Sequence, residues 1–184
     1  MSRLAALGGL AVWLAAAPAS AAEDPLPAAL LTAIATLAPT TVPVERADLD
    51  ADHCAAQAAH PARVRGDFDG DGREDWAMLL RSPSPVRTET FGGRRWPIHP
   101  VRFVVFFGRA GGRFEPHTIS LGDDSLPSIT MLLLQPPGRI REWGQGQVIE
   151  LRQPGIVQVH CDKAATTWFW DALGGRFDSI VTAD

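Results

Sequence analysis

Four aspartates lie close together in the middle of the chain, at Asp67, Asp69, Asp71 and Asp75. Hard cations such as Ca²⁺ take about six to eight oxygen ligands, and alternate side chains can converge on one ion when the backbone coils around it. Gly72 follows the third aspartate, where such a loop must bend sharply. Without a cation, four carboxylates in so short a segment would repel one another. The spacing therefore predicts a calcium-binding loop, although Asp and Gly in this pattern also favour a turn that holds no ion.

The loop begins like an EF-hand but ends differently. An EF-hand places a bidentate Glu at the twelfth position, which here is Met78, and a helix follows it. The apolar run from Trp76 to Leu80 predicts a strand after the loop instead. Asp75 is therefore expected to complete the site, and Arg73 can add its backbone carbonyl.

The segment Gly66 to Ala77, GDFDGDGREDWA, resembles the calcium loop of FG-GAP and VCBS-type repeats, which occur in integrin-like propellers and in many exported bacterial proteins. In those repeats a strand and a Gly-rich hairpin follow the loop, and Val104 to Phe114 resembles that hairpin. The resemblance covers roughly Gly66 to Phe114. It implies calcium ligation by the side chains of Asp67, Asp69, Asp71 and Asp75 and by the carbonyl of Arg73. Because the chain carries the motif once, we expect a calcium-stabilised module and not a full propeller.

The N-terminus has the pattern of a signal peptide. Arg3 gives a basic start, Leu4 to Ala17 is apolar, and Ala19-Ser20-Ala21 matches a cleavage site for small residues. The apolar run is shorter than the roughly 20 residues that a membrane-spanning helix needs. We therefore predict a signal peptide at residues 1–22, export to the periplasm or the exterior, and a single domain at residues 23–184.

Two cysteines, Cys54 and Cys161, are the only ones in the chain. For an exported protein a disulfide between them is the first expectation. Each follows a histidine, His53 or His160, so a zinc site is an alternative. It is the weaker one, because neighbouring residues on a strand point to opposite faces.

Hydrophobic periodicity predicts an α+β fold that is dominated by its sheets. A helix is expected between Pro25 and Pro39, and a second one is possible from Asp50 to His60. About eight short, mainly antiparallel strands joined by hairpins should follow. Their segments are 76–80, 101–107, 114–121, 129–134, 148–152, 156–160, 166–170 and 177–181. Residues 103–107 are apolar throughout, which predicts a central strand that is covered on both faces.

Two further segments carry expectations. The stretch from Arg81 to Pro100 contains four prolines and is predicted to be a long loop, either a solvated insertion or an Arg-rich recognition loop. The sequences of Val105 to Phe114 and Trp168 to Phe177 both end in Gly-Gly-Arg-Phe, which predicts two similar hairpins.

The sequence favours a non-enzymatic, exported calcium-binding module whose loops or exposed aromatic residues contact a protein or glycan of the cell envelope. No catalytic motif of the serine-hydrolase elbow, zinc-protease or phosphate-binding loop type is present. The formal net charge of −4 gives no reason to expect nucleic acid. The alternative is an envelope hydrolase or a thiol-dependent enzyme that uses Cys161 and His160.

Overall fold

The computed structural model describes residues 25–49, 62–91, 93–125, 129–161 and 163–183. The predicted signal peptide and the possible helix from Asp50 to His60 lie outside these residues. The elements, in chain order, are α1 (Ala28–Leu37), β1 (Val42–Pro43), η1 (Arg46–Asp48), β2 (Arg63–Gly66), β3 (Asp75–Arg81), β4 (Arg87–Phe91), β5 (Arg94–Arg109), β6 (Arg113–Ser125), β7 (Thr130–Gln135), β8 (Gly138–Arg141), β9 (Val148–Leu151), β10 (Gly155–His160), β11 (Ala164–Asp171) and β12 (Arg176–Ala183). The predicted sheet-dominated α+β class is confirmed.

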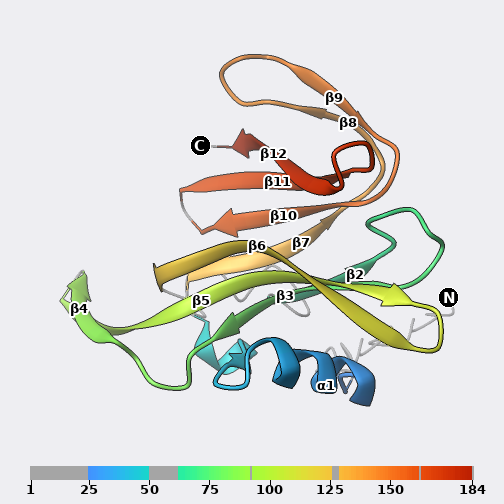
Figure 1. The fold of residues 1–184 in the computed structure, drawn as a ribbon. Coiled ribbons are helices and arrows are strands. Elements are labelled where there is room, and N and C mark those ends of the chain that lie inside the picture. The colour runs from blue at the N-terminus through green and yellow to red at the C-terminus, as the bar shows by residue number, and fades with distance from the viewer. Residues whose placement is uncertain (1–24, 50–61, 92, 126–128, 162, 184) are drawn as a thin grey trace, which may run out of the picture.

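Within the described residues, three antiparallel sheets and the helix α1 form successive layers (Figure 1). The first sheet has six strands with β3 and β5 at its centre, flanked by β1 and β2 on one side and by β4 and β6 on the other. The second sheet has the order β12-β11-β10-β7, and the third is the hairpin β8–β9. In Figure 1, α1 lies below the first sheet, and the second and third sheets lie above it. This arrangement is not a ring of propeller blades.

The central strand β5 is buried on both faces because its apolar residues alternate between two cores. Val104 and Phe106 face α1, where they pack with Leu30 and Ile34. Phe103, Val105 and Phe107 face the second sheet and belong to the largest core cluster. The prediction of a covered central strand at residues 103–107 is thus confirmed. The hairpin β8–β9 covers the other face of the second sheet, where Ile140 and Leu151 of the hairpin pack with Phe169 of β11.

The prediction of a long loop from Arg81 to Pro100 was wrong. Strand β4 pairs with the first part of β5 in a two-stranded arm that extends from the body of the molecule (Figure 1). Prolines are excluded from central strands because they lack an N–H, but an arm with outer edges tolerates them. Residues 82–86 form a shorter loop before β4, and hydrogen bonds such as that from Ser82 N to Pro100 O, at 2.9 Å, fasten it to β5.

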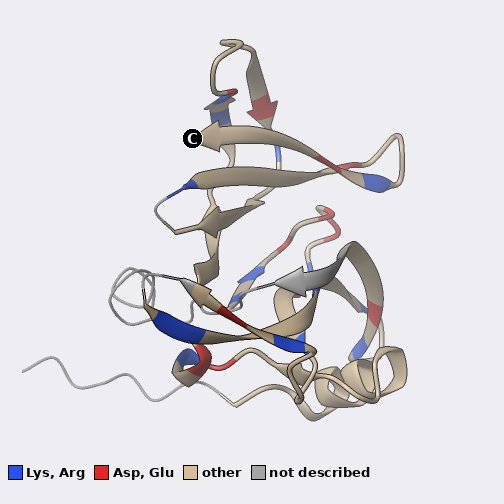
Figure 2. Ribbon diagram, turned by 90° about the vertical axis from the view of Figure 1, so that its left-hand side faces the viewer, with Lys and Arg blue, Asp and Glu red and all other residues tan. Residues whose placement is uncertain are grey.

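The two hairpins predicted from the Gly-Gly-Arg-Phe sequences are both present, as β5–β6 and β11–β12. Basic and acidic residues are scattered over the ribbon in Figure 2, in both the lower and the upper layers. Among the described residues, no helix combines the length and the apolar character that crossing a membrane requires.

Candidate metal centre

The aspartate loop, residues 67–74, connects two adjacent antiparallel strands. Gly66, at the end of β2, is paired with Asp75, at the start of β3. Between these paired residues the chain turns so that Asp67, Asp69 and Asp71 converge, and one carboxylate oxygen of each lies within 4.8 Å of the others. In the described part of the chain, no other group of three or more His, Cys, Asp or Glu side chains meets this condition. This group could hold a metal ion.

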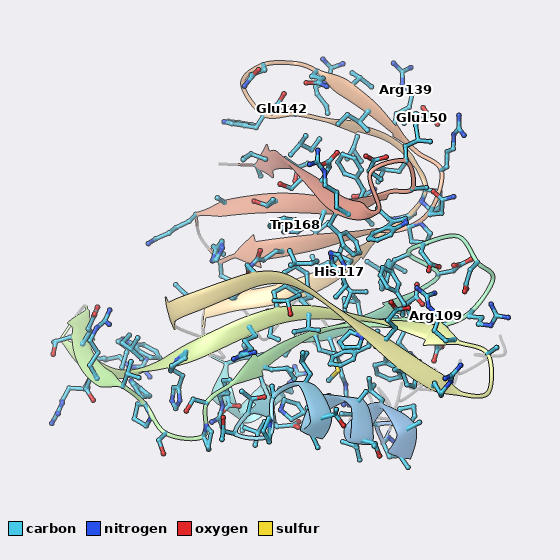
Figure 3. All side chains as sticks on the ribbon, in the orientation of Figure 1. Arg109, His117, Arg139, Glu142, Glu150 and Trp168 are labelled. Atoms are coloured by element: carbon cyan, nitrogen blue, oxygen red, sulfur yellow. The ribbon has the colours of Figure 1, made fainter. Side chains whose placement is uncertain are left out.

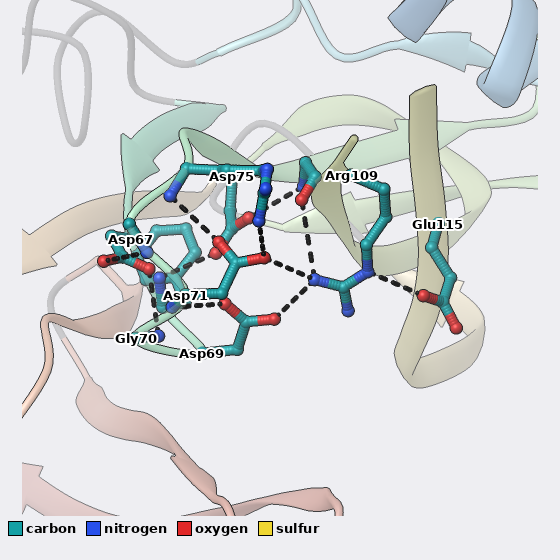
Figure 4. A network of polar contacts seen from close by, with 11 residues as sticks. Asp67, Asp69, Gly70, Asp71, Asp75, Arg109 and Glu115 are labelled. Carbon is teal, nitrogen blue, oxygen red and sulfur yellow. Dashed lines mark hydrogen bonds and ion pairs between the residues drawn. The ribbon is translucent and has the colours of Figure 1, made fainter. Parts of the chain in front are cut away.

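The backbone of the loop directs these carboxylates (Figure 4). Asp67 Oδ1 accepts the N–H of Gly70 at 2.9 Å, and Oδ2 accepts the N–H of Gly72 at 3.0 Å. Gly70 and Gly72 have φ values of 79° and 82°, in the left-handed region that favours glycine. Asp69 and Asp71 each accept the N–H of the residue two positions ahead, at 3.2 and 2.9 Å. These turns place the side chains on the inside of the bend.

Phe68 holds the loop to the hydrophobic core. Its side chain has no exposed surface and belongs to the core between the first and second sheets. An aromatic residue between two aspartates thus points into the core while its neighbours point towards the loop centre. Fully burying a Phe side chain contributes about 1.5–3 kcal/mol, so the loop conformation is held by the core as well as by its own turns.

Asp75 joins the loop to the centre of the first sheet. It is fully buried, and its two carboxylate oxygens accept the N–H of Phe68 at 2.7 Å and of Gly108 at 2.8 Å. Burial raises the pKa of Asp75 to about 6; the N–H donors of Gly108 and Phe68 oppose this rise, and the charge of Asp69 adds to it. Asp75 does not belong to the converging group. Its ligand role and that of the Arg73 carbonyl remain predictions.

Arg109 is a member of the site that the sequence did not indicate. It is the last residue of β5 and lies at the end of the sheet (Figure 3). Its Nη1 donates to Asp69 Oδ2 at 2.6 Å and to Asp71 Oδ2 at 3.2 Å, and its Nε donates to Glu115 Oε2 at 2.8 Å. The guanidinium carbon lies 4.9 Å from the centre of the Phe107 ring. Hydrogen bonds to Glu115 and Asp69 raise the pKa of Arg109 further, so this side chain is always charged.

The pKa of Asp71 is affected by both arginines of the site, Arg73 and Arg109. Its limited burial acts to raise its pKa, but hydrogen bonds from the backbone and side chain of Arg73 and the charges of Arg73 and Arg109 outweigh this effect. The pKa of Asp71 is therefore below its usual range. Asp71 remains a charged oxygen donor at neutral pH.

Cys161 and His160 do not form a second site in the described residues. Cys161 is buried and takes part in a disulfide bond. The expected partner, Cys54, and its neighbour His53 lie outside the described residues. Burial, followed by the charge of Lys163, lowers the pKa of His160, whose Nδ1 lies 3.3 Å from Thr130 Oγ1.

Comparisons with protein-family models, with curated proteins and with solved structures found no match for this chain. The resemblance of residues 66–114 to FG-GAP and VCBS-type repeats therefore stays a prediction.

Proposed function

We propose that this protein is an exported, non-enzymatic calcium-binding module in which the ion stiffens the connection between β2 and β3. The observation that supports this proposal is the convergence of Asp67, Asp69 and Asp71, each of which has a carboxylate oxygen within 4.8 Å of those of the other two. Asp75 and the Arg73 carbonyl complete the proposed ligand set. The ion would offset the repulsion among the carboxylates, which are held together by the turns of the loop.

The chemistry of these donors favours calcium over other common ions. All proposed ligands are oxygens, whereas zinc in proteins prefers nitrogen and sulfur. Mg²⁺ requires a near-ideal octahedral site and retains several waters, whereas Ca²⁺ accepts irregular loops. Extracellular calcium modules bind with a Kd of about 10⁻⁴ to 10⁻³ M, which suits the export that the N-terminal pattern predicts.

The proposed role is mechanical, because the loop is connected to the centre of the fold. Asp75 bonds to Gly108 on β5, and Phe68 lies in the core between the two large sheets. A rigid loop would hold this end of β3 and β5 in register. At 1 mM Ca²⁺ and a Kd of about 0.1 mM, binding adds about 1.4 kcal/mol to the free energy of unfolding. The ion would therefore stiffen a domain that already folds.

The proposed partner is a protein or glycan of the cell envelope, contacted by loops or exposed aromatic residues. Trp143, which is 57% exposed in the turn between β8 and β9, is one such residue. The alternative of a thiol-dependent enzyme is less well supported, because Cys161 is buried and disulfide-bonded and so offers no thiolate.

Thermal melting of the mature chain in EDTA and in millimolar CaCl₂ tests the proposal. For a domain of this size, about 1.4 kcal/mol should raise Tm by about 3 to 6 °C. Asp69→Asn should abolish this shift, because it removes a ligand charge while keeping the size of the side chain. Asp178→Asn makes the same chemical change on β12, away from the loop, and should retain the shift. An equal Tm in EDTA and CaCl₂ for the wild type would remove the basis of the proposal.

A further inference from the structure

The carboxylate oxygens of the three converging aspartates differ in their hydrogen-bond partners. Both oxygens of Asp67 accept backbone N–H groups, as do Oδ1 of Asp69 and Oδ1 of Asp71. The two remaining oxygens are Oδ2 of Asp69 and Oδ2 of Asp71. Both accept Nη1 of Arg109, at 2.6 and 3.2 Å. Asp71 Oδ2 also accepts Nη1 of Arg73 at 3.0 Å. The two oxygens that accept no backbone N–H are therefore both held by guanidinium groups, and Arg109 is the one that bridges them.

The position of Arg109 is fixed by the same contacts that fix the loop. Gly108, the preceding residue, donates its N–H to Asp75 Oδ1 at 2.8 Å. A Cβ at Gly108 would collide with the carbonyl oxygen of Glu74, which shows how closely the loop approaches β5 there. The backbone of Arg109 therefore lies beside the aspartates whenever the loop is folded. Its cationic group has a high local concentration at the site.

Arg109 also has a second partner outside the loop. Glu115, on β6, accepts the Nε of Arg109 at 2.8 Å and is 66% exposed, whereas Asp69 is 10% exposed. The guanidinium can therefore leave the aspartates and keep a charged partner at the surface. Such charge-assisted bonds are stronger than neutral ones, so both arrangements are stabilised.

We propose that Arg109 is a tethered competitor of the metal ion, so that ion binding and the Arg109 contacts with Asp69 and Asp71 exclude each other. The inference rests on the proposed calcium site. At low calcium Arg109 neutralises part of the loop charge and holds the loop folded. At high calcium the ion takes the two Oδ2 atoms, and Glu115 is the acidic partner that Arg109 retains. The apparent Kd for calcium then equals the intrinsic Kd divided by the fraction of molecules in which Arg109 has left the site.

Calorimetric titration of CaCl₂ into matched variants tests this competition. Arg109→Gln should lower the Kd for calcium about tenfold, which corresponds to about 1.4 kcal/mol. Arg113→Gln is the matched control, because Arg113 is paired with Arg109 across the same hairpin but its Nε donates to Ala110 O. It makes the same change of net charge and should change Kd less than about twofold, since exposed charges are screened by salt.

Thermal melting in EDTA supplies the second readout. Arg109→Gln should melt at a lower temperature than the wild type in EDTA, although it binds calcium more tightly. A residue that only positions the aspartates would change both quantities in the unfavourable direction. A Kd for Arg109→Gln that equals or exceeds that of Arg113→Gln would overturn the inference. If Arg109→Gln does not fold, the Nε–H resonance of Arg109 in the wild type must shift on calcium saturation, and an unchanged resonance overturns it.

The failure of the inference differs from the failure of the proposed function. If neither the wild type nor Arg109→Gln binds calcium at millimolar concentrations, both proposals are wrong. If the wild type binds calcium and Arg109→Gln binds no more tightly, only the competition is wrong. Binding by Arg109→Gln alone would support the competition and show that Arg109 excludes the ion in the wild type.

Discussion

The hairpins β5–β6 and β11–β12 share a sequence pattern but differ in what they hold. Their sequences are VFFGRAGGRF, from Val105, and WFWDALGGRF, from Trp168. Both turn through glycines, and Gly111, Gly112 and Gly175 have positive φ values of 80°, 69° and 61°. Their aromatic residues meet between the sheets, as the rings of Phe107 and Trp170 lie 4.9 Å apart.

The difference lies in the two residues after the aromatic run. In β11–β12 these are Asp171 and Ala172, and Asp171 accepts the N–H groups of Leu173 and Gly174, both at 3.0 Å, within its own turn. In β5–β6 they are Gly108 and Arg109, which contact the aspartate loop. The turn of β11–β12 is thus stabilised by hydrogen bonds within itself, whereas the turn of β5–β6 is bound to the aspartate loop through Gly108 and Arg109.

The largest expected effect concerns the aromatic contact that both hairpins share. Phe107→Ala should lower the free energy of unfolding by about 3–5 kcal/mol, because Phe107 is buried between the sheets. Phe177 stacks on Phe107 with ring centres 5.9 Å apart but is only half-buried, so Phe177→Ala should cost less. Urea unfolding measures both. An equal or larger loss for Phe177→Ala would contradict the description of Phe107 as the centre of this contact.

The next largest effect on stability concerns the close contact between Gly108 and the aspartate loop. Gly108→Ala should cost about 3 kcal/mol, because the added Cβ would collide with the backbone oxygen of Glu74. Gly111→Ala, in the same hairpin, meets nothing within 4 Å and should cost about 1 kcal/mol for its positive φ. Chemical denaturation of the two variants gives the comparison. Equal losses would show that the loop does not press on β5 at this point.

The free energy of unfolding should depend on pH through Asp75, which bonds to Gly108 of the β5–β6 hairpin. Its folded pKa of about 6 exceeds the usual value of 3.8, so the folded protein binds a proton that the unfolded chain has released. The resulting stability is fully present below about pH 4 and is lost as the pH rises through about 6. Urea unfolding in EDTA at about pH 4.5 and pH 7 should show this loss in the wild type but not in Asp75→Asn. The same pH dependence in both proteins would assign it to other groups.

The smallest effect on stability concerns the turn of the β11–β12 hairpin. Asp171→Ala should cost about 1 kcal/mol, because two backbone N–H groups lose an acceptor in an exposed turn where water can replace it. It should leave calcium binding unchanged, in contrast to Asp69→Asn. Urea unfolding and calorimetric titration of this variant measure the two quantities. A changed calcium affinity would show that the two hairpins are coupled.

The sequence predicted much of the fold because hydrophobic periodicity is local. The strands around residues 103–107 and 166–170 are evident from their apolar and aromatic runs, and Trp168 and Phe169 face opposite cores, as alternation requires. The arm of β4 and β5 was missed, because prolines such as Pro97 argue against a central strand but not against an outer one. Short strands such as β2 and β8 are defined by their pairing and not by a pattern of their own.

The sequence predicted only the part of the candidate site that depends on a local pattern. The alternation of Asp67, Asp69 and Asp71 indicates the loop directly. Arg109 is 40 residues away from Asp69 in sequence, and their contact depends on the pairing of β3 with β5. The burial of Asp75 likewise depends on that pairing and could not be read from its spacing.

The most direct test of the central claim is a calcium titration of the uniformly ¹⁵N-labelled protein, followed by amide spectra. The account predicts that the amides of Gly70, Asp71, Gly72 and Arg73 shift together and saturate with one ion per chain, while the amides of Leu173 and Gly174 do not move. Unchanged loop amides at millimolar calcium, or saturable shifts confined to another part of the chain, would contradict it.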